Sequence, residues 1–305
     1  MTCKVCDFLG DWLEIRKTSV RPRTVEQYRG AIARINRAIG ERSLLDLTPA
    51  ACASAYAADL AAGHERTAQI THQVLKMALA DAVAFGMIPA SPMSAIKRPR
   101  HTVGKVEPFT HDEVARILRA DPAHSYLWVL LWRSGIRRGE ACALRWSDVD
   151  FARETLSINK QLVSTSNGVI ESAPKSESGV RVIPIDSRCI QLLRNHLRDQ
   201  VADGRAGDYV ISADGRRPDP RRVNRLLLEA AAAAGVGEAH PHRFRHTYGT
   251  DGVSAGVPIR VLQALMGHSE ITVTAKYYAA VRDDAMVSAS NQMQAYWSDK
   301  VTSVF

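Results

Sequence analysis

Four short segments of the sequence combine a turn with side chains that suit phosphate chemistry. The first two are Ser-Gly-Ile-Arg-Arg-Gly-Glu at 134–140 and Pro-Lys-Ser at 174–176. The other two are His-Pro-His-Arg-Phe-Arg-His at 240–246 and Leu-Met-Gly-His at 265–268, which precedes a Tyr-Tyr pair. Arginine presents a planar fork of N–H donors that pairs with phosphate oxygens. The segments therefore predict a site for a phosphate group, with six candidate residues: Arg137, Lys175, His242, Arg245, His268 and Tyr277.

The order and spacing of these segments resemble the tyrosine recombinase family, and in particular the phage-type integrases. The pattern of that family is a G-L-R-x-x-E box, a lysine in a hairpin, an H-x-x-R box, and an L-G-H box followed nine residues later by tyrosine. The resemblance covers the chain from about residue 5 to residue 285. It implies that the first five candidates surround a scissile DNA phosphate and that Tyr277 is the nucleophile.

The chemistry of strand cleavage fits these roles. Attack on a phosphodiester builds negative charge on two non-bridging oxygens, which Arg137 and Arg245 would stabilise with fixed hydrogen bonds. A free tyrosine has a pKa near about 10, so Tyr277 needs a base, and His242 is the candidate. Lys175 would give a proton to the departing 5′-hydroxyl. Because the phosphotyrosyl bond retains the energy of the broken phosphodiester, neither a nucleotide cofactor nor a metal ion is expected.

Each candidate taken alone has a simpler interpretation. A single arginine at a helix start, or a histidine among other basic residues, is typical of an ordinary protein surface. Lys160 lies in the same predicted sheet region as Lys175 and remains an alternative to it. Tyr278 is the alternative nucleophile, although the nine-residue step from His268 selects Tyr277. Only the joint pattern is specific.

The first hundred residues are predicted to form helices separated by short turns. Thr-Val-Glu-Gln at 24–27 has the spacing of a capping box and predicts the start of a helix with a regular apolar period. Thr48 and Pro49 are typical of the start of a second helix, which should stop at Gly63. A third apolar period begins at Ile70 and ends at Gly86. The basic stretch that follows, 97–105, contains proline and glycine and predicts a linker, so the predicted domains are residues 1–104 and 105–305.

The second domain should be mostly helical with a small antiparallel sheet. Thr-His-Asp-Glu at 110–113 predicts a capped helix, and 126–132 predicts a buried one. Within 155–185, Leu156 and Ile158, and later Val180 and Val182, alternate with polar residues and are separated by turn residues. The fold class is therefore mainly α. The resemblance implies a SAM-like, core-binding N-terminal domain and a catalytic domain of the tyrosine recombinase fold.

Composition limits the partners and the location. The net charge is +8, and 31 of the 40 basic residues are arginine. Charge alone does not identify a polyanionic partner, since a GC-rich genome also raises the arginine content. The five cysteines are scattered, and the Cys3/Cys6 pair lacks a second pair to complete a zinc site. The apolar runs are far shorter than the ~20 residues of a membrane-spanning helix and the first residues do not form a signal peptide, so a cytoplasmic, nucleoid-associated protein is expected.

The predicted function is site-specific DNA recombination through a covalent 3′-phosphotyrosyl intermediate and a four-way junction, with phage integration and excision as the favoured role. The expected partners are double-stranded core attachment sites, further copies of the chain in a homotetramer on two duplexes, and a directionality factor. A Xer-like resolvase or a transposon recombinase is the alternative within the family. Outside it, a type IB topoisomerase uses similar chemistry. A non-catalytic DNA-binding regulator would usually have lost one of the six groups, and all six are present.

Two further expectations concern the ends of the chain. Many phage integrases carry an additional N-terminal module for arm-type DNA sites, whereas the helical pattern begins almost at once here, so an integrase without that module is expected. Beyond the predicted nucleophile, apolar residues recur at steps of three or four and predict a helix with an apolar face that must be buried. That face could pack on its own catalytic domain, whereas the resemblance implies that it docks on a neighbouring protomer, which is the favoured expectation. These residues are Met286, Ala289, Met293, Tyr296 and Trp297.

Overall fold

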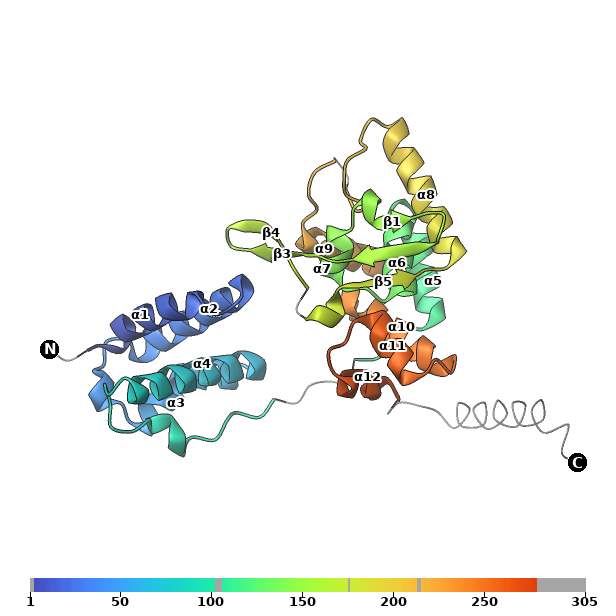
Figure 1. Ribbon diagram of the computed structural model, residues 1–305. Helices are drawn as coiled ribbons and strands as arrows, with labels where there is room; N and C mark the ends of the chain where they lie inside the picture. The colour runs from blue at the N-terminus through green and yellow to red at the C-terminus, as the bar shows by residue number, and fades with distance from the viewer. Residues whose placement is uncertain (1–2, 102–105, 175, 213–214, 279–305) are drawn as a thin grey trace, which may run out of the picture. The chain divides into compact units, whose positions relative to one another are not determined.

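Contacts within the chain divide it into two compact units, Met1–Gly104 and Lys105–Phe305, each described below by itself (Figure 1). This computed structural model describes residues 3–101, 106–174, 176–212 and 215–278. The candidate Lys175 and the apolar residues predicted to form a helix at 286–297 lie outside the described residues.

The first unit is built from α-helices around one apolar core. Its helices are α1 (Val5–Lys17), α2 (Pro22–Ile39), α3 (Pro49–Ala61) and α4 (Glu65–Ala84), with the short 3-10 turns η1 (Leu44–Asp46) and η2 (Pro92–Ala95). The largest fully buried side chains in this core include Trp12, Ile35, Leu75 and Leu79. Each helix therefore contributes its apolar face to the same interior, which is the requirement for an independent helical domain.

Local capping decides where two of these helices begin. Oγ1 of Thr48 accepts a hydrogen bond from the N–H of Ala51 at 3.2 Å, and α3 starts at the following proline, as predicted. The prediction that the 24–27 capping box opens α2 is wrong, because the helix already begins at Pro22 with Arg21 as its N-cap. A proline in the first turn has a backbone angle pre-set for a helix and loses no hydrogen bond there, so the helix starts ahead of Thr24.

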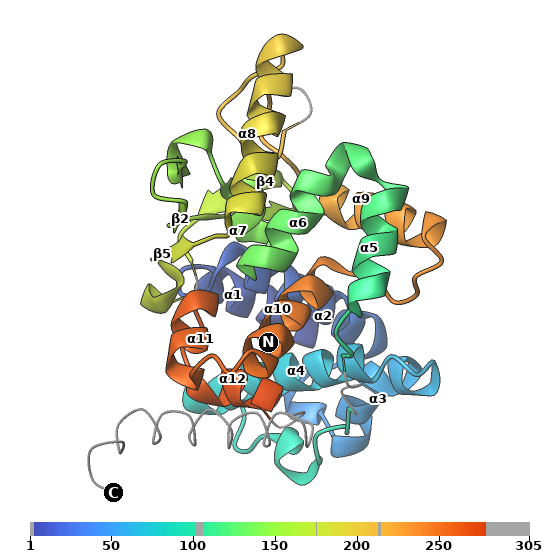
Figure 2. The ribbon, with the colours of Figure 1, turned by 90° about the vertical axis from the view of Figure 1, so that its right-hand side faces the viewer.

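The second unit is mostly helical, and α6 lies at its centre. The helices are α5 (His111–Ala120), α6 (Ser125–Ser134), α7 (Arg138–Ala143), α8 (Ser187–Ala202), α9 (Pro220–Ala233), α10 (Pro241–Ser254), α11 (Ile259–Met266) and α12 (Ile271–Tyr278). Residues 126–131 of α6 are all buried, as predicted, and Trp132 is partly buried. The capping box predicted for α5 is present, with both reciprocal bonds between Thr110 and Glu113. Figure 2 shows α10, α11 and α12 packed together on one side of this unit.

Two small antiparallel sheets interrupt the helices, where a single sheet was predicted. Strands β1 (Val149–Asp150), β2 (Thr155–Ile158) and β5 (Arg181–Pro184) form the first, in the order β1-β2-β5, and β3 (Gln161–Thr165) pairs with β4 (Gly168–Ser172) in the second.

The side-chain alternation predicted for the sheet holds in β2 and fails near β5. Leu156 and Ile158 are buried as expected, whereas Val180 and Val182 are 57% and 64% exposed. Leu156 pairs with Ile183 and Ser157 with Val182, and paired residues of antiparallel strands share a face. The pairing with β2 therefore turns Ile183 inward and Val182 outward.

Candidate active site

Arg137 occupies the N-cap position of α7, directly after the turn that ends α6. Its Nη1 donates to Oε1 of Glu140 at 2.7 Å, and its Nη2 donates to the carbonyl of Gly267 at 3.0 Å. Glu140 is only 2% exposed and also accepts the backbone N–H of Arg137. The guanidinium group is therefore fixed in place while its side chain stays 35% exposed to solvent.

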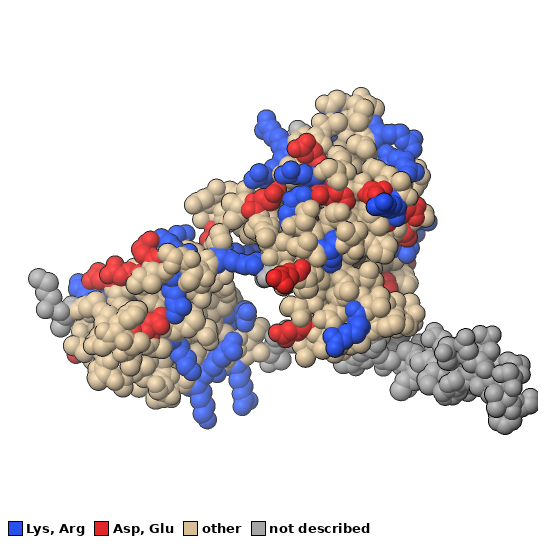
Figure 3. Space-filling model, viewed as in Figure 1, with Lys and Arg blue, Asp and Glu red and all other residues tan. Residues whose placement is uncertain are grey.

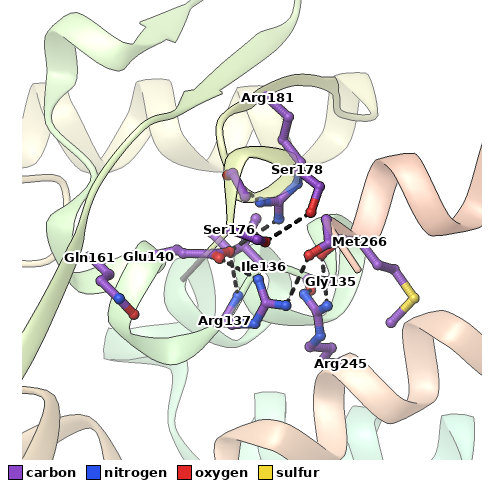
Figure 4. A network of polar contacts seen from close by, with 12 residues as sticks. Gly135, Ile136, Arg137, Glu140, Gln161, Ser176, Ser178, Arg181, Arg245 and Met266 are labelled. Atoms are coloured by element: carbon purple, nitrogen blue, oxygen red, sulfur yellow. Dashed lines mark hydrogen bonds and ion pairs between the residues drawn. The ribbon is translucent and has the colours of Figure 1, made fainter. Parts of the chain in front are cut away.

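Arg245 is a buried arginine on α10, held by backbone carbonyls (Figure 4). Its Nη1 donates to the carbonyl of Gly135 and its Nη2 to that of Met266, both at 2.7 Å. Burial, and then the charge of Arg137, lower the pKa of Arg245 to about 9, so the group still carries its charge at neutral pH. Its buried Nε has no hydrogen-bond partner among the described residues. Such an unpaired donor costs about 1–3 kcal/mol, which an anion bound beside it would offset.

Three guanidinium groups meet at the C-terminal end of α11. They donate to three consecutive carbonyls, in the pairs Arg181 with Leu265 (2.8 Å), Arg245 with Met266 (2.7 Å) and Arg137 with Gly267 (3.0 Å). The last carbonyls of a helix lack partners within the helix and carry partial negative charge. The end of α11 is thus a scaffold that gathers positive charge at one place.

His268 lies in the turn between α11 and α12, and Tyr277 lies near the end of α12. Gly267 ends α11 in the left-handed conformation, with φ 65°, so His268 leaves the helix axis. The imidazole, which is 5% exposed, lies with Nδ1 2.9 Å from the hydroxyl oxygen of Thr274. Its ring is parallel to that of Tyr277, with centroids 6.2 Å apart, and the ring of His246 meets Tyr277 edge-on at 4.9 Å. The phenol therefore lies between one ring from α10 and one ring from the turn after α11.

Burial and neighbouring positive charge keep the site's histidines neutral, and burial opposes ionisation of the tyrosine. Desolvation, then the charges of Arg245 and Arg137, lower the pKa of His268 to about 3. His242 lies in the first turn of α10, near the surface, and desolvation and Arg245 lower its pKa to about 4. Desolvation raises the pKa of Tyr277 although both arginines act in the opposite direction. At neutral pH both imidazoles are thus uncharged, and the phenol keeps its proton.

The sequence and the fold were compared with those of known proteins. Residues 107–284 match the phage integrase family, and residues 5–57 match its N-terminal SAM-like domain.

The chain belongs to the phage integrase family. This confirms the resemblance drawn from the motifs, and with it the predicted fold and the predicted enzyme class, a tyrosine-type DNA recombinase.

Relatives of this chain include proteins named as integrases and proteins named as Xer-type recombinases. A putative prophage phiRv2 integrase of Mycobacterium tuberculosis is 28% identical over 283 residues, which cover 90% of this chain and 74% of the relative. A XerC-like tyrosine recombinase of Caldanaerobacter subterraneus is 29% identical over 217 residues, or 64% of this chain and 54% of that protein.

Solved structures share the fold. The Tn1549 transposon integrase, in complex with a circular intermediate DNA, superimposes with a TM-score of 0.80 at 20% identity over 95% of this chain and 99% of that one. A lambda integrase dimer bound to a core site superimposes with a TM-score of 0.70 at 20% identity, over 90% of this chain and 77% of that one.

Five of the six predicted site residues lie in the described part of the chain. Arg137, Arg245, His268 and Tyr277 gather around the end of α11, and His242 lies one turn before Arg245 on α10. The histidine and arginine of the H-x-x-R box therefore share a helix, as their spacing predicted. Their catalytic roles remain predictions.

The alternative lysine, Lys160, has a different environment. Its Nζ donates to both carboxylate oxygens of Asp148, at 2.8 and 3.0 Å, and to the side-chain oxygen of Asn159. The side chains of Lys160 and Asp148 are only 17% and 9% exposed. Lys160 is thus committed to a structural contact, which favours Lys175 as the candidate acid.

Arg181 is the residue at this site that sequence reasoning missed. It opens β5 and, besides the carbonyl of Leu265, its side chain contacts Glu140 and the carbonyl of Gly179. Arg181 lies between Val180 and Val182, which were expected to face the core. The arginine was therefore expected to face the solvent. The available signal was Ile183, two residues further on, which points to the same face of the strand.

Two searches of the described residues gave negative results. No group of three or more His, Cys, Asp or Glu side chains that could hold a metal ion is present among them. None of the helices in the described part of the chain is long and apolar enough to cross a membrane.

Proposed function

We propose that the chain cleaves and rejoins DNA at a specific site through a covalent 3′-phosphotyrosyl intermediate, with Tyr277 as the nucleophile. The observation that supports this best is the convergence of Arg137 and Arg245 on adjoining carbonyls of the turn that holds His268 against Tyr277. Two fixed guanidinium groups, a neutral imidazole and a phenol are the groups that phosphoryl transfer to tyrosine requires.

In the proposed cleavage step, the Tyr277 hydroxyl oxygen attacks the scissile phosphorus, and the bond from phosphorus to the 5′-oxygen breaks. His242 takes the phenol proton, and Lys175 gives a proton to the departing oxygen. Arg137 and Arg245 donate to the non-bridging oxygens, where negative charge accumulates. A 5′-hydroxyl from a partner strand reverses the step, breaks the phosphotyrosyl bond and restores the phenol.

For the assembly, we propose a homotetramer on two duplexes that carry core attachment sites, with a directionality factor selecting integration or excision. The DNA complexes of the Tn1549 and lambda integrases support a duplex partner. Lys and Arg side chains gather along one edge of the first unit in Figure 3, which favours a role in binding the DNA backbone. Exposed basic residues of α4 and the following segment include Arg66, Lys76, Lys97, Arg98 and Arg100.

Phage integration and excision is the role that we favour, because the relative aligned over 90% of the chain is named a prophage integrase. A Xer-like resolvase or a transposon recombinase uses the same chemistry and remains the alternative within the family. A type IB topoisomerase would relax one supercoiled plasmid without exchanging strands between two DNA molecules.

The test is to recover the DNA that the protein binds covalently from a library of candidate core sites. Each site carries a nick that lets the 5′-hydroxyl fragment diffuse away, so that the phosphotyrosyl adduct accumulates. We expect one sequence to be enriched, joined through its 3′-phosphate, and to support exchange between two plasmids. Adducts on unrelated sequences, with plasmid relaxation and no exchange, would instead indicate a topoisomerase, and the absence of any adduct would contradict the proposal.

A further inference from the structure

Arg181 makes contacts that join three parts of the candidate active site. Nε donates to the carbonyl of Leu265 at 2.8 Å, Nη1 to that of Gly179 at 3.0 Å, and Nη2 to Oε2 of Glu140 at 3.1 Å. The side chain is 8% exposed. Leu265 belongs to the end of α11, Glu140 to α7, and Gly179 to the segment that follows the candidate acid Lys175, so one guanidinium group connects all three.

The pairing of β5 with β2 explains why this charged side chain faces inward. Arg181 pairs with Ile158, and Ile183 pairs with Leu156, so all four side chains lie on the buried face. A buried arginine is stable only if its donors are bonded. Here two carbonyls and one carboxylate meet that requirement.

Glu140 accepts hydrogen bonds from the side chains of two arginines. Oε1 accepts from Nη1 of Arg137 at 2.7 Å, while Oε2 accepts from Nη2 of Arg181 at 3.1 Å (Figure 4). Burial of this carboxyl acts to raise its pKa, but Arg181 and Arg137 outweigh it, and the pKa lies below the usual value. Arg181 thereby keeps the carboxylate ionised and fixes the orientation of the oxygens that hold Arg137.

The glycine of the L-M-G-H box is also fitted to Arg181. A Cβ added to Gly267 would lie 2.8 Å from Nη1 of Arg181 and 2.9 Å from the carbonyl oxygen of Ser178. The backbone of the turn that precedes His268 therefore packs directly on the guanidinium group. Any displacement of Arg181 would be transmitted to the turn that supports both the histidine and the carbonyl bonded to Arg137.

We propose that Arg181 is a positioning residue for strand cleavage that does not touch the DNA phosphate itself. It sets Arg137 through Glu140, and by bonding the Leu265 carbonyl and packing on Gly267 it holds the segment whose Met266 and Gly267 carbonyls bind Arg245 and Arg137. This inference rests on the proposed function. It assigns to Arg181 an effect on the rate of strand cleavage, separate from any effect on the stability of the fold.

The test compares Arg181→Gln with Arg116→Gln in single-turnover cleavage of a nicked core site. Arg116 is a matched control, because it bonds the carbonyls of Ala234 and Gly235 at the end of α9 and the carboxylate of Asp112, away from the candidate site. We expect Arg181→Gln to lower the cleavage rate constant about 10- to 100-fold, as loss of a group that orients transition-state donors does. DNA affinity and the final amount of adduct should stay within about threefold, and Arg116→Gln should cleave like the parent.

A purely structural role gives a different result. If Arg181 only stabilised the fold, Arg181→Gln would lower the fraction of competent protein and therefore the amount of adduct. The competent fraction would still cleave with the rate constant of the parent. Thermal unfolding of each free variant measures the loss of stability. Arg181→Lys should cleave at an intermediate rate, because it restores a charge beside Glu140 but loses the fork. A parental rate constant for Arg181→Gln would overturn the inference. Absence of adduct from the parent itself would overturn the proposed function, and this inference with it.

Discussion

The imidazole of His268 and the phenol of Tyr277 lie in planes that differ by 5°, with their centroids 6.2 Å apart. His268 belongs to the turn that follows α11, and a hydrogen bond between its Nδ1 and the Thr274 hydroxyl fixes the imidazole. The tyrosine ring also packs on α10, where Gly249 leaves room for it. The direction of the phenol is thus set by contacts from α10, α11 and α12 together.

Tyr277→Phe should bind core-site DNA like the parent and form no covalent adduct, because it removes only the attacking oxygen. A nicked substrate on a denaturing gel measures the adduct, and a gel shift measures binding. Tyr278→Phe is the control and should still trap DNA. Trapping by Tyr277→Phe together with its loss in Tyr278→Phe would assign the nucleophile to Tyr278.

Gly249→Ala should lower cleavage strongly while DNA binding is kept. A Cβ at position 249 would lie 2.8–2.9 Å from three carbon atoms of the Tyr277 ring, so the phenol must move. We expect a loss of about 100-fold in the cleavage rate, as for other displaced reacting groups. Gly252→Ala, on the same helix, instead meets Cδ1 of Leu262 at 2.8 Å, a methyl group that takes no part in the reaction, and should cleave within about threefold of the parent. Equal losses in the two variants would show that general disturbance of α10 is responsible.

Arg245→Lys should reduce cleavage by about 100- to 1,000-fold with little change in DNA affinity. Lysine keeps the positive charge but cannot donate to Gly135, Met266 and a phosphate oxygen in one rigid geometry. Single-turnover cleavage and equilibrium binding on the same site separate the two effects. Parallel losses in both would place Arg245 among general DNA contacts.

Replacement of His268 by glutamine should reduce the acid sensitivity of the free protein. Its pKa is about 3 in the folded chain against 6.5 for an ordinary histidine, so between these values the unfolded state binds a proton that the folded state does not. The free energy of unfolding therefore falls as the pH drops below 6.5, with the slope that corresponds to one extra proton bound by the unfolded state. Thermal unfolding across this range should show a shallower decline for His268→Gln than for the parent. Parallel curves would mean that His268 is not held neutral by its surroundings.

Removal of residues 284–305 should leave the monomer folded and able to bind a half-site, while cooperative binding to a full site is lost and recombination falls more than binding. The expectation comes from the apolar residues between 286 and 297, which lie outside the described residues, and from the resemblance to tyrosine recombinases, which suggests that this segment docks on a neighbouring protomer. Gel shifts on half and full sites, with thermal unfolding of the truncated chain, measure the two properties separately. A large loss of stability with intact cooperativity would indicate packing within the same chain.

Sequence reasoning located the helix starts at Thr48 and Thr110 because an N-cap bond joins residues only three positions apart. The H-x-x-R box is similarly local, since its two residues share one turn of α10. The order of the four motif segments was enough to identify the family, because each segment carries its chemistry in a few adjacent residues.

Tertiary structure alone decided which strand face is buried and which groups meet. The alternating residues around β5 are compatible with either phase, and the pairing of Ile183 with Leu156 selects the one that buries Arg181 and exposes Val182. The sharing of Glu140 by two arginines from distant segments was equally unpredictable. Local propensity acts over a few residues, whereas the strand register pairs Leu156 with Ile183 and the end of α11 brings Arg137 to Gly267, 130 positions away.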